Sequence, residues 1–229
     1  MHLFKGSSQS LDPRAAARQA VRAALKGAEA PAAAVVFCTE QYGARQLAEA
    51  VGAELGAVPW AGCSTGGVID GGRVLRQGVV VGLLSSSRLR VGIGVGRNVG
   101  ADPRSAGATA AREALRPLPA AAPRGHRVLF VFTDAQAGNA AEVVRGASQF
   151  AGADVLWAGG GAGDHLHSLA QLANGEAFTD AVVIVAIDGE RRFGAGVAHG
   201  WRPYGPPALV TRAEGRVVHE LEYDSAFEV

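Results

Sequence analysis

The segment Gly62-Cys63-Ser64-Thr65-Gly66 places a thiol and two hydroxyls between glycines. A nucleophile on a tight glycine turn is how acyl-transfer enzymes expose a reactive side chain, and the spacing satisfies the pattern G-x-S-x-G. That pattern needs a helix directly after the turn, whereas the stretch after Gly66 is turn-like and rich in further glycine. The alternative function is therefore a hydrolase with Cys63 or Ser64 as nucleophile. Its other catalytic groups would be His199 and Asp164.

A second glycine-rich segment, Gly159 to Gly163, leads into Asp164-His165-Leu166-His167. Two imidazoles beside a carboxylate suggest metal ligation, but a metal site normally needs three or four ligands, and no further set of ligands has recognisable spacing. The glycine runs at 92–96 and 159–163 also suggest a dinucleotide. Neither leads directly into a long helix, and the chain has no Walker A lysine. We expect no metal, no cofactor and no catalytic residue.

His199, Trp201 and Tyr204 follow an apolar strand-like run, in the segment GVAHGWRPYGPP. Aromatic residues beside Gly and Pro at the edge of a sheet often close the end of a core. The functional alternative is a pocket wall with an imidazole donor. Both interpretations remain open at this point.

The composition excludes several classes of protein. The chain has 229 residues with 48% hydrophobic and 19% charged residues, and its formal net charge is +1, which gives no electrostatic support for nucleic-acid binding. Its longest apolar run is far shorter than the roughly 20 residues of a membrane-spanning helix. Cys38 and Cys63 form no CxxC pair, and the segment Met1 to Arg14 lacks the apolar run that is typical of a secretory signal. We therefore expect a cytoplasmic protein that binds neither nucleic acid nor membrane.

The elements that position these residues occur twice in the same order. Asp-Pro-Arg triplets at 12–14 and 102–104 open Ala/Arg-rich helices, because Asp caps free amides of the first turn and Pro suits the first helical position. The matching segments are the helices that end near Leu25 and Leu115, strands at Val35–Thr39 and Leu129–Thr133, helices at Ala44–Leu55 and Ala140–Phe150, tryptophan–glycine segments from Pro59 and Leu156, and apolar hairpins at Gly78–Arg97 and Ala181–His199.

This order predicts an α+β fold of duplicated helix–strand–helix–strand–hairpin halves, which form mixed β-sheets covered by helices in a sandwich. The halves span about 11–100 and 101–205, with a closing strand at 216–222. Within each half the strand–helix–strand unit gives a parallel pair, and the hairpin adds antiparallel edges. Trp60 is expected to superpose on Trp157, and Gly94 on Gly196. One continuous sheet and two stacked sheets both remain possible.

The ordered segments GCSTGG, the glycine-rich hairpin, GGGAGD, and the run from GVAHGWRPYGPP to the closing strand resemble the FIST amino-terminal domain. The resemblance covers about Pro31 to Val229, so that residues 1–229 would form a single FIST-N-like domain. It implies a bacterial intracellular sensory module that binds a small ligand, with amino acids as suggested ligands and no established catalysis. The family usually continues into a carboxy-terminal FIST domain, which we expect to be absent from this chain. That domain, or a signalling protein, would be its partner.

The resemblance also assigns candidate ligand contacts. They are Gly62, Cys63, Ser64, Thr65 and Gly66 in the first segment, Gly161, Gly163 and Asp164 in the second, and His199 beyond them. Equivalent loops of a duplicated fold emerge at equivalent strand ends, so we expect the turns Gly62–Gly67 and Gly159–Asp164 to converge on one cleft, with His199 on its rim. Backbone amides in such turns bind carboxylates, and Asp164 would meet an ammonium group, which suits a zwitterionic amino acid.

Overall fold

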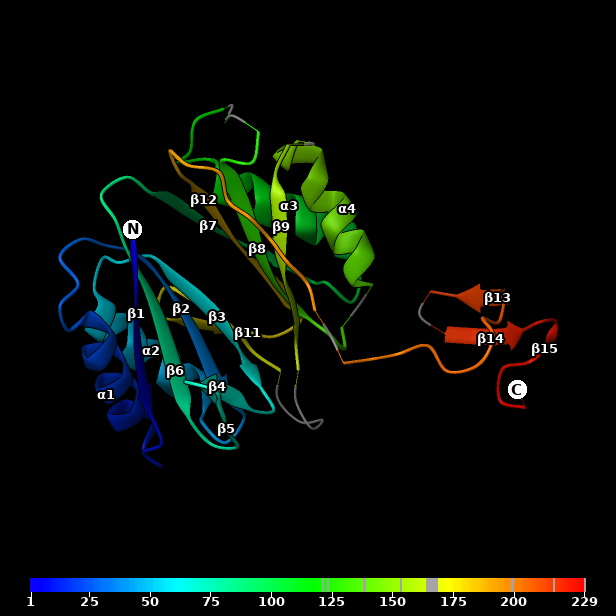
Figure 1. Ribbon diagram of the computed structural model, residues 1–229, viewed down its shortest axis with the longest axis horizontal. Coiled ribbons are helices and arrows are strands. Elements are labelled where there is room, and N and C mark those ends of the chain that lie inside the picture. The colour runs from blue at the N-terminus through cyan, green and yellow to red at the C-terminus, as the bar shows by residue number, and fades with distance from the viewer. Residues whose placement is uncertain are drawn as a thin grey trace. The chain divides into compact units, whose positions relative to one another are not determined.

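The computed structural model describes residues 1–120, 122, 124–137, 139–152, 154–163, 169–198, 200–215 and 217–228. The chain divides into two compact units, Met1–Gly194 and Ala195–Val229. The larger unit contains the predicted helices and both glycine-rich segments (Figure 1).

The predicted helices are confirmed, with starts set by local caps. The Asp12 side chain accepts a hydrogen bond from the Ala15 amide at 2.6 Å, and the Asp102 side chain accepts one from the Ser105 amide at 2.9 Å. Both aspartates precede a proline at the first helical position, as the Asp-Pro-Arg triplets predict. The helices among the described residues are α1 (Pro13–Leu25), α2 (Ala44–Leu55), α3 (Pro103–Leu115) and α4 (Ala140–Ala151).

Two mixed sheets form the centre of the larger unit. The first has the order β1-β6-β2-β3-β10-β11 and the second the order β7-β12-β8-β9, with parallel β2–β3 and β8–β9 pairs. The strands of the first sheet are β1 (His2–Ser8), β2 (Pro31–Thr39), β3 (Trp60–Thr65), β6 (Val79–Ser85), β10 (Gln171–Ala173) and β11 (Glu176–Phe178). Those of the second are β7 (Arg90–Arg97), β8 (Arg127–Asp134), β9 (Leu156–Ala162) and β12 (Ala181–Asp188).

The two sheets are stacked, and helices cover their outer faces. α1 and α2 pack on the first sheet and α3 and α4 on the second (Figure 1). A third apolar cluster fills the space between the sheets, where Phe37 and Phe132 meet edge to face with ring centroids 5.9 Å apart. The α+β sandwich expected from the repeat is therefore confirmed, in its stacked form.

The internal repeat is visible in the sheet order, because β1-β6-β2-β3 and β7-β12-β8-β9 run in the same sense. Both repeats begin with a strand. In the first sheet Val36 lies opposite Gly62, and in the second Val131 lies opposite Gly159, so Val36 corresponds to Val131. The sequence match pairs Val36 with Phe130, one residue away, and is wrong. A shift of one residue moves every side chain to the other face of a strand.

The predicted hairpin at Gly78–Arg97 is also wrong. β6 lies between β1 and β2 in the first sheet, whereas β7 pairs with β12 in the second. The chain thus leaves one sheet and enters the other between Ser85 and Arg90. Two apolar runs with a short connection are typical of a hairpin. The sequence does not indicate which other strands these two runs pair with.

Glycine at every second position of β7 allows α3 to lie directly against the strand. A Cβ on Gly92, Gly94 or Gly96 would lie 2.0 Å from a carbonyl oxygen of α3 in each case. The same contact occurs in the first repeat, where a Cβ on Gly6 would lie 1.9 Å from the Ala20 carbonyl oxygen of α1. The glycine run at 92–96 therefore serves helix–sheet packing.

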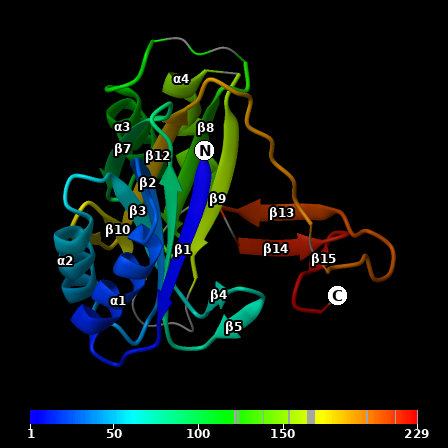
Figure 2. The same cartoon turned by 60° about the vertical axis from the view of Figure 1, so that its left-hand side comes forward.

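A hairpin from the second repeat completes the first sheet. β10 pairs antiparallel with β3, so residues from beyond β9 extend a sheet that begins at the amino terminus. The corresponding hairpin of the first repeat, β4 (Val68–Asp70) and β5 (Arg73–Leu75), forms a separate two-stranded sheet (Figure 2). The equivalent strands β3 and β9 therefore have different neighbours: β3 pairs with β10, whereas β9 is the last strand of its sheet among the described residues.

The smaller unit contains β13 (Val210–Glu214), β14 (Val217–Leu221) and β15 (Asp224–Ser225), which form one antiparallel sheet. The predicted hairpin at Ala181–His199 is wrong, because only its first strand, β12, forms. Residues 192–198 adopt no regular structure. Gly196 therefore lies outside any strand, unlike Gly94 in β7, and the two do not occupy equivalent positions.

Candidate functional site

The two glycine-rich segments are mostly strands, which corrects their prediction as turns. β3 and β9 contain Gly62 and Gly159 at equivalent positions. A Cβ on Gly62 would lie 1.7 Å from the Val36 carbonyl oxygen, and one on Gly159, whose φ is +131°, would lie 2.1 Å from that of Val131. Glycine is required at both positions because the neighbouring strand approaches too closely for a side chain.

The carboxyl ends of β3 and β9 meet. Thr65 and Gly163 form an isolated parallel β-bridge, which joins the two sheets. The Thr65 hydroxyl donates to the Gly67 carbonyl oxygen at 3.3 Å, Gly66 is half-buried, and Gly163 is exposed. The structure therefore brings together Thr65 and Gly66 from the first segment and Gly163 from the second. We call this place the strand-end junction.

Asp134 supports the junction from the end of β8, where it lies opposite Ala162. Its carboxylate is buried and accepts three backbone hydrogen bonds: from Gln136 at 2.8 Å, from Ala137 at 3.1 Å and from Asp180 at 3.3 Å. These contacts hold the loop that follows β8 and the start of β12 in place. The polar groups of this aspartate are thus occupied by structural contacts.

Cys63 and Ser64 do not open onto the junction. The Cys63 side chain is buried in the apolar cluster between the sheets, and burial raises the pKa of its thiol to about 12. The Ser64 hydroxyl is buried and accepts a hydrogen bond from the Ala170 amide at 2.9 Å, while the Ser64 amide donates to the Ala170 carbonyl at 2.9 Å. Ser64 thus binds the segment that leads into β10.

The remaining predicted site residues do not gather at the junction among the described residues. Gly161 lies in β9 near the junction and lines a groove described below. Asp164 and His199 lie outside the described residues, as do His165 and His167 of the metal hypothesis. Trp201 and Tyr204 lie in the smaller unit and are exposed.

A groove beside β9 is a second candidate site, which sequence reasoning missed. It has a volume of about 270 Å³ and is bounded by α4 and by the strands β8 and β9. Its lining contains no charged side chain, and the buried Thr133 hydroxyl has no hydrogen-bond partner among the described residues. We call it the β9 groove; it is lined by Val131, Thr133, Ala140, Val144, Trp157, Ala158, Gly159, Gly160 and Gly161. The sequence signal that could have indicated this groove is Trp157, the counterpart of Trp60 in the repeat.

Within the parts of the chain that the structure describes, no group of three or more His, Cys, Asp or Glu side chains is arranged to hold a metal ion. None of the helices found there has the length and apolar character needed to cross a bilayer.

No curated protein matches the chain. Among solved structures, two of cyanuric acid hydrolase match at 12% identity with a TM-score of 0.40; one is described as "evolutionary innovation by structural concatenation" and the other is from A. caulinodans. The matches cover 82% of this chain and 67% and 72% of the respective hydrolase chains. A TM-score below 0.5 and so low an identity do not extend the hydrolase activity to this chain.

The family comparison agrees with the resemblance seen in the sequence. The model of the FIST N domain matches residues 32–223, which extend from β2 to β14 and include the whole second repeat but not β1 and α1 of the first. FIST domains are a sensory, ligand-binding family. The chain therefore belongs to the FIST N domain family.

Proposed function

We propose that this FIST N domain is a cytoplasmic sensor that binds a small zwitterionic molecule, an amino acid, at the strand-end junction. The observation that carries the proposal is the bridge between Thr65 and Gly163, because it joins the carboxyl ends of two parallel strand pairs. Ligands of α/β proteins favour crevices at such strand ends. The bridge thus brings the ends of both glycine-rich segments to one place.

The chemistry of the two candidate sites separates them for this ligand. A zwitterion needs a partner for its carboxylate and another for its ammonium group. The β9 groove contains no charged side chain, which disfavours burial of an unpaired ammonium group there. At the junction, glycine amides suit a carboxylate, and Asp164, which follows Gly163 directly in the chain, would provide the negative charge.

We propose no catalytic role for Cys63 or Ser64. A thiol whose pKa is raised to about 12 is almost entirely protonated at neutral pH, and the thiol form is a poor nucleophile. The Ser64 hydroxyl already accepts a backbone hydrogen bond at a buried position. Both side chains therefore support the architecture of the site, and signalling would require a partner, either a FIST-C domain or a signalling protein.

The test is a thermal-shift screen of the full chain against single amino acids. Ligand at about 100 times its Kd should stabilise the protein by about 2.7 kcal/mol. We expect Asp164→Asn to abolish that shift while leaving the melting temperature of the free protein unchanged, and Cys63→Ala to retain it because the backbone amide remains. Asp154→Asn is the matched control, since Asp154 is an exposed carboxylate before β9 that pairs with Arg124. Either the lack of a shift with every amino acid or an unchanged shift in Asp164→Asn would refute the proposal.

A further inference from the structure

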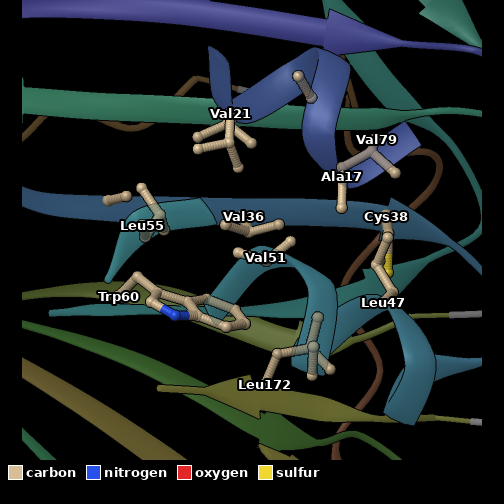
Figure 3. Packing of buried hydrophobic residues seen from close by; sticks show 14 of the residues in the cluster. Ala17, Val21, Val36, Cys38, Leu47, Val51, Leu55, Trp60, Val79 and Leu172 are labelled. Atoms are coloured by element: carbon tan, nitrogen blue, oxygen red, sulfur yellow. The ribbon is translucent and has the colours of Figure 1, made fainter. Parts of the chain in front are cut away.

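The edge of β3 that faces away from β2 is covered by another strand of the same chain, β10. β10 runs antiparallel to β3, with Leu172 opposite Gly62. At one end of the pairing the Asn174 amide donates to the Trp60 carbonyl at 3.1 Å. The Leu172 side chain is fully buried beside Trp60 and the α2 residues Leu47 and Val51 (Figure 3). A branched aliphatic side chain on an added strand thus fills the space between β3 and its helix.

β9 is the counterpart of β3 in the second repeat, but it is the last strand of its sheet in the described part of the chain. Gly159 corresponds to Gly62 and Trp157 to Trp60. The β9 groove, formed by β8, β9 and α4, therefore lies where the first repeat holds Leu172 against β2, β3 and α2. The two repeats present the same edge, and only one of them is covered by a strand.

The exposure of two equivalent helix residues differs in the way expected if this edge is covered in the first repeat and open in the second. α2 and α4 begin and end at matching positions, so Ala48 corresponds to Val144. Ala48 is 0% exposed, whereas Val144 is 37% exposed and lines the groove. Thr133 also lines the groove, and its buried hydroxyl has no hydrogen-bond partner among the described residues.

We propose that the outer edge of β9 binds an antiparallel β-strand of a partner protein, with a branched aliphatic side chain opposite Gly159. Addition of a strand to an open sheet edge is a common mode of peptide recognition, in which backbone hydrogen bonds give affinity and pockets for alternate side chains give specificity. The uncharged lining requires an uncharged anchor side chain. The groove provides the pocket and β9 provides the backbone. This surface shares Gly161 with the predicted ligand contacts but contains none of Thr65, Gly66 and Gly163, and it gives the sensor a place to contact its output.

The probe is the segment of this chain that covers the equivalent edge of β3. A fluorescent synthetic peptide with the sequence of residues 169–178, LAQLANGEAF, contains the β10–β11 hairpin and its leucine anchor. We expect saturable binding of this peptide to the full chain, measured by fluorescence anisotropy. A peptide with aspartate in place of the anchor leucine should bind at least tenfold more weakly. Hydrogen exchange should show new protection of the backbone amides of β9 when the first peptide is bound.

Variants of the protein locate the binding surface. Val144→Asp places a charge in the β9 groove at a partly exposed helical position and should weaken binding at least tenfold, with an unchanged circular dichroism spectrum. Ile69→Asp is the matched control, because Ile69 is an exposed apolar residue on β4, away from the groove lining, and this variant should bind like the wild type. The absence of saturable binding, equal affinity for both peptides, or wild-type affinity in Val144→Asp would each overturn the proposal. Asp164→Asn should leave peptide binding unchanged, so the two proposed sites fail or succeed separately.

Discussion

Addition of a single methyl group at Gly94 tests the packing of α3 on β7. The Cβ of Gly94→Ala would lie 2.0 Å from the Ala110 carbonyl oxygen and 2.6 Å from the Ala114 amide nitrogen. Ordinary contact begins near 3.4 Å, so helix and strand would have to separate by about 1.4 Å. Because the obstacle is backbone on both sides, rotation of a side chain cannot relieve it.

The expected cost follows from two opposing effects. Overpacking of a close-packed core costs about 1–3 kcal/mol, and a backbone obstacle places this site at the upper end. Replacement of glycine by alanine in a regular element recovers about 0.5–1 kcal/mol of backbone entropy. We therefore expect Gly94→Ala to lower the free energy of unfolding by about 2 kcal/mol.

The assay is urea denaturation followed by circular dichroism, with Gly82→Ala as the matched control. Gly82 is also a strand glycine, in β6, but its Cβ would lie 3.9 Å from the nearest atom, in the Leu3 side chain. That variant should be as stable as the wild type or up to about 1 kcal/mol more stable. Equal stability of the Gly94 and Gly82 variants would refute the argument that close approach requires glycine in β7.

Three other expectations concern the core and its titration. Leu172→Ala should lower the free energy of unfolding by about 2–5 kcal/mol in urea denaturation, since it leaves a cavity between β3 and α2. Asp188→Ala should cost about 3–5 kcal/mol in the same assay, because it leaves the buried guanidinium of Arg127 without the carboxylate that it contacts at 2.6 and 2.8 Å. Burial raises the pKa of Cys38 and of Cys63 to about 12, so above about pH 9 the unfolded chain releases protons that the folded chain retains, and stability should fall by about 1.4 kcal/mol per pH unit for each thiol. Cys38→Ala with Cys63→Ala should flatten that part of the pH profile, measured by the urea midpoint.

The sequence predicted the helices well because their signals are local. Asp12 and Asp102 each precede a proline and cap the helix that follows, and the order of repeated segments predicted two halves of mixed sheet covered by helices without deciding whether the sheets stack. The pairing of strands was not predictable in this way. Val79–Ser85 and Arg90–Arg97 are neighbours in the chain, yet they belong to different sheets, since their partners lie far away in sequence.

The same limit applies to the candidate site. Equivalent strand ends follow from a duplicated fold, so the meeting of the segments that contain Thr65 and Gly163 could be anticipated from the repeat. The β9 groove could not, because it depends on β10 crossing to β3 and leaving β9 at an edge. The contributions of Asp164 and His199 stay predictions, since both lie outside the described residues.

The crossing of β10–β11 to the first sheet also sets an order of events during translation. β3 is complete when Thr65 has been synthesised, but the hairpin that covers its edge ends at Phe178. At about 5–20 residues per second, the ribosome takes roughly 5–20 s to make the intervening segment. During that interval the indole of Trp60 and the apolar face of α2 lack Leu172 and remain accessible to chaperones. We therefore expect the amino-terminal repeat to complete its core only after residue 178 has been made, and a nascent chain that stalls before residue 171 should be a substrate for quality control.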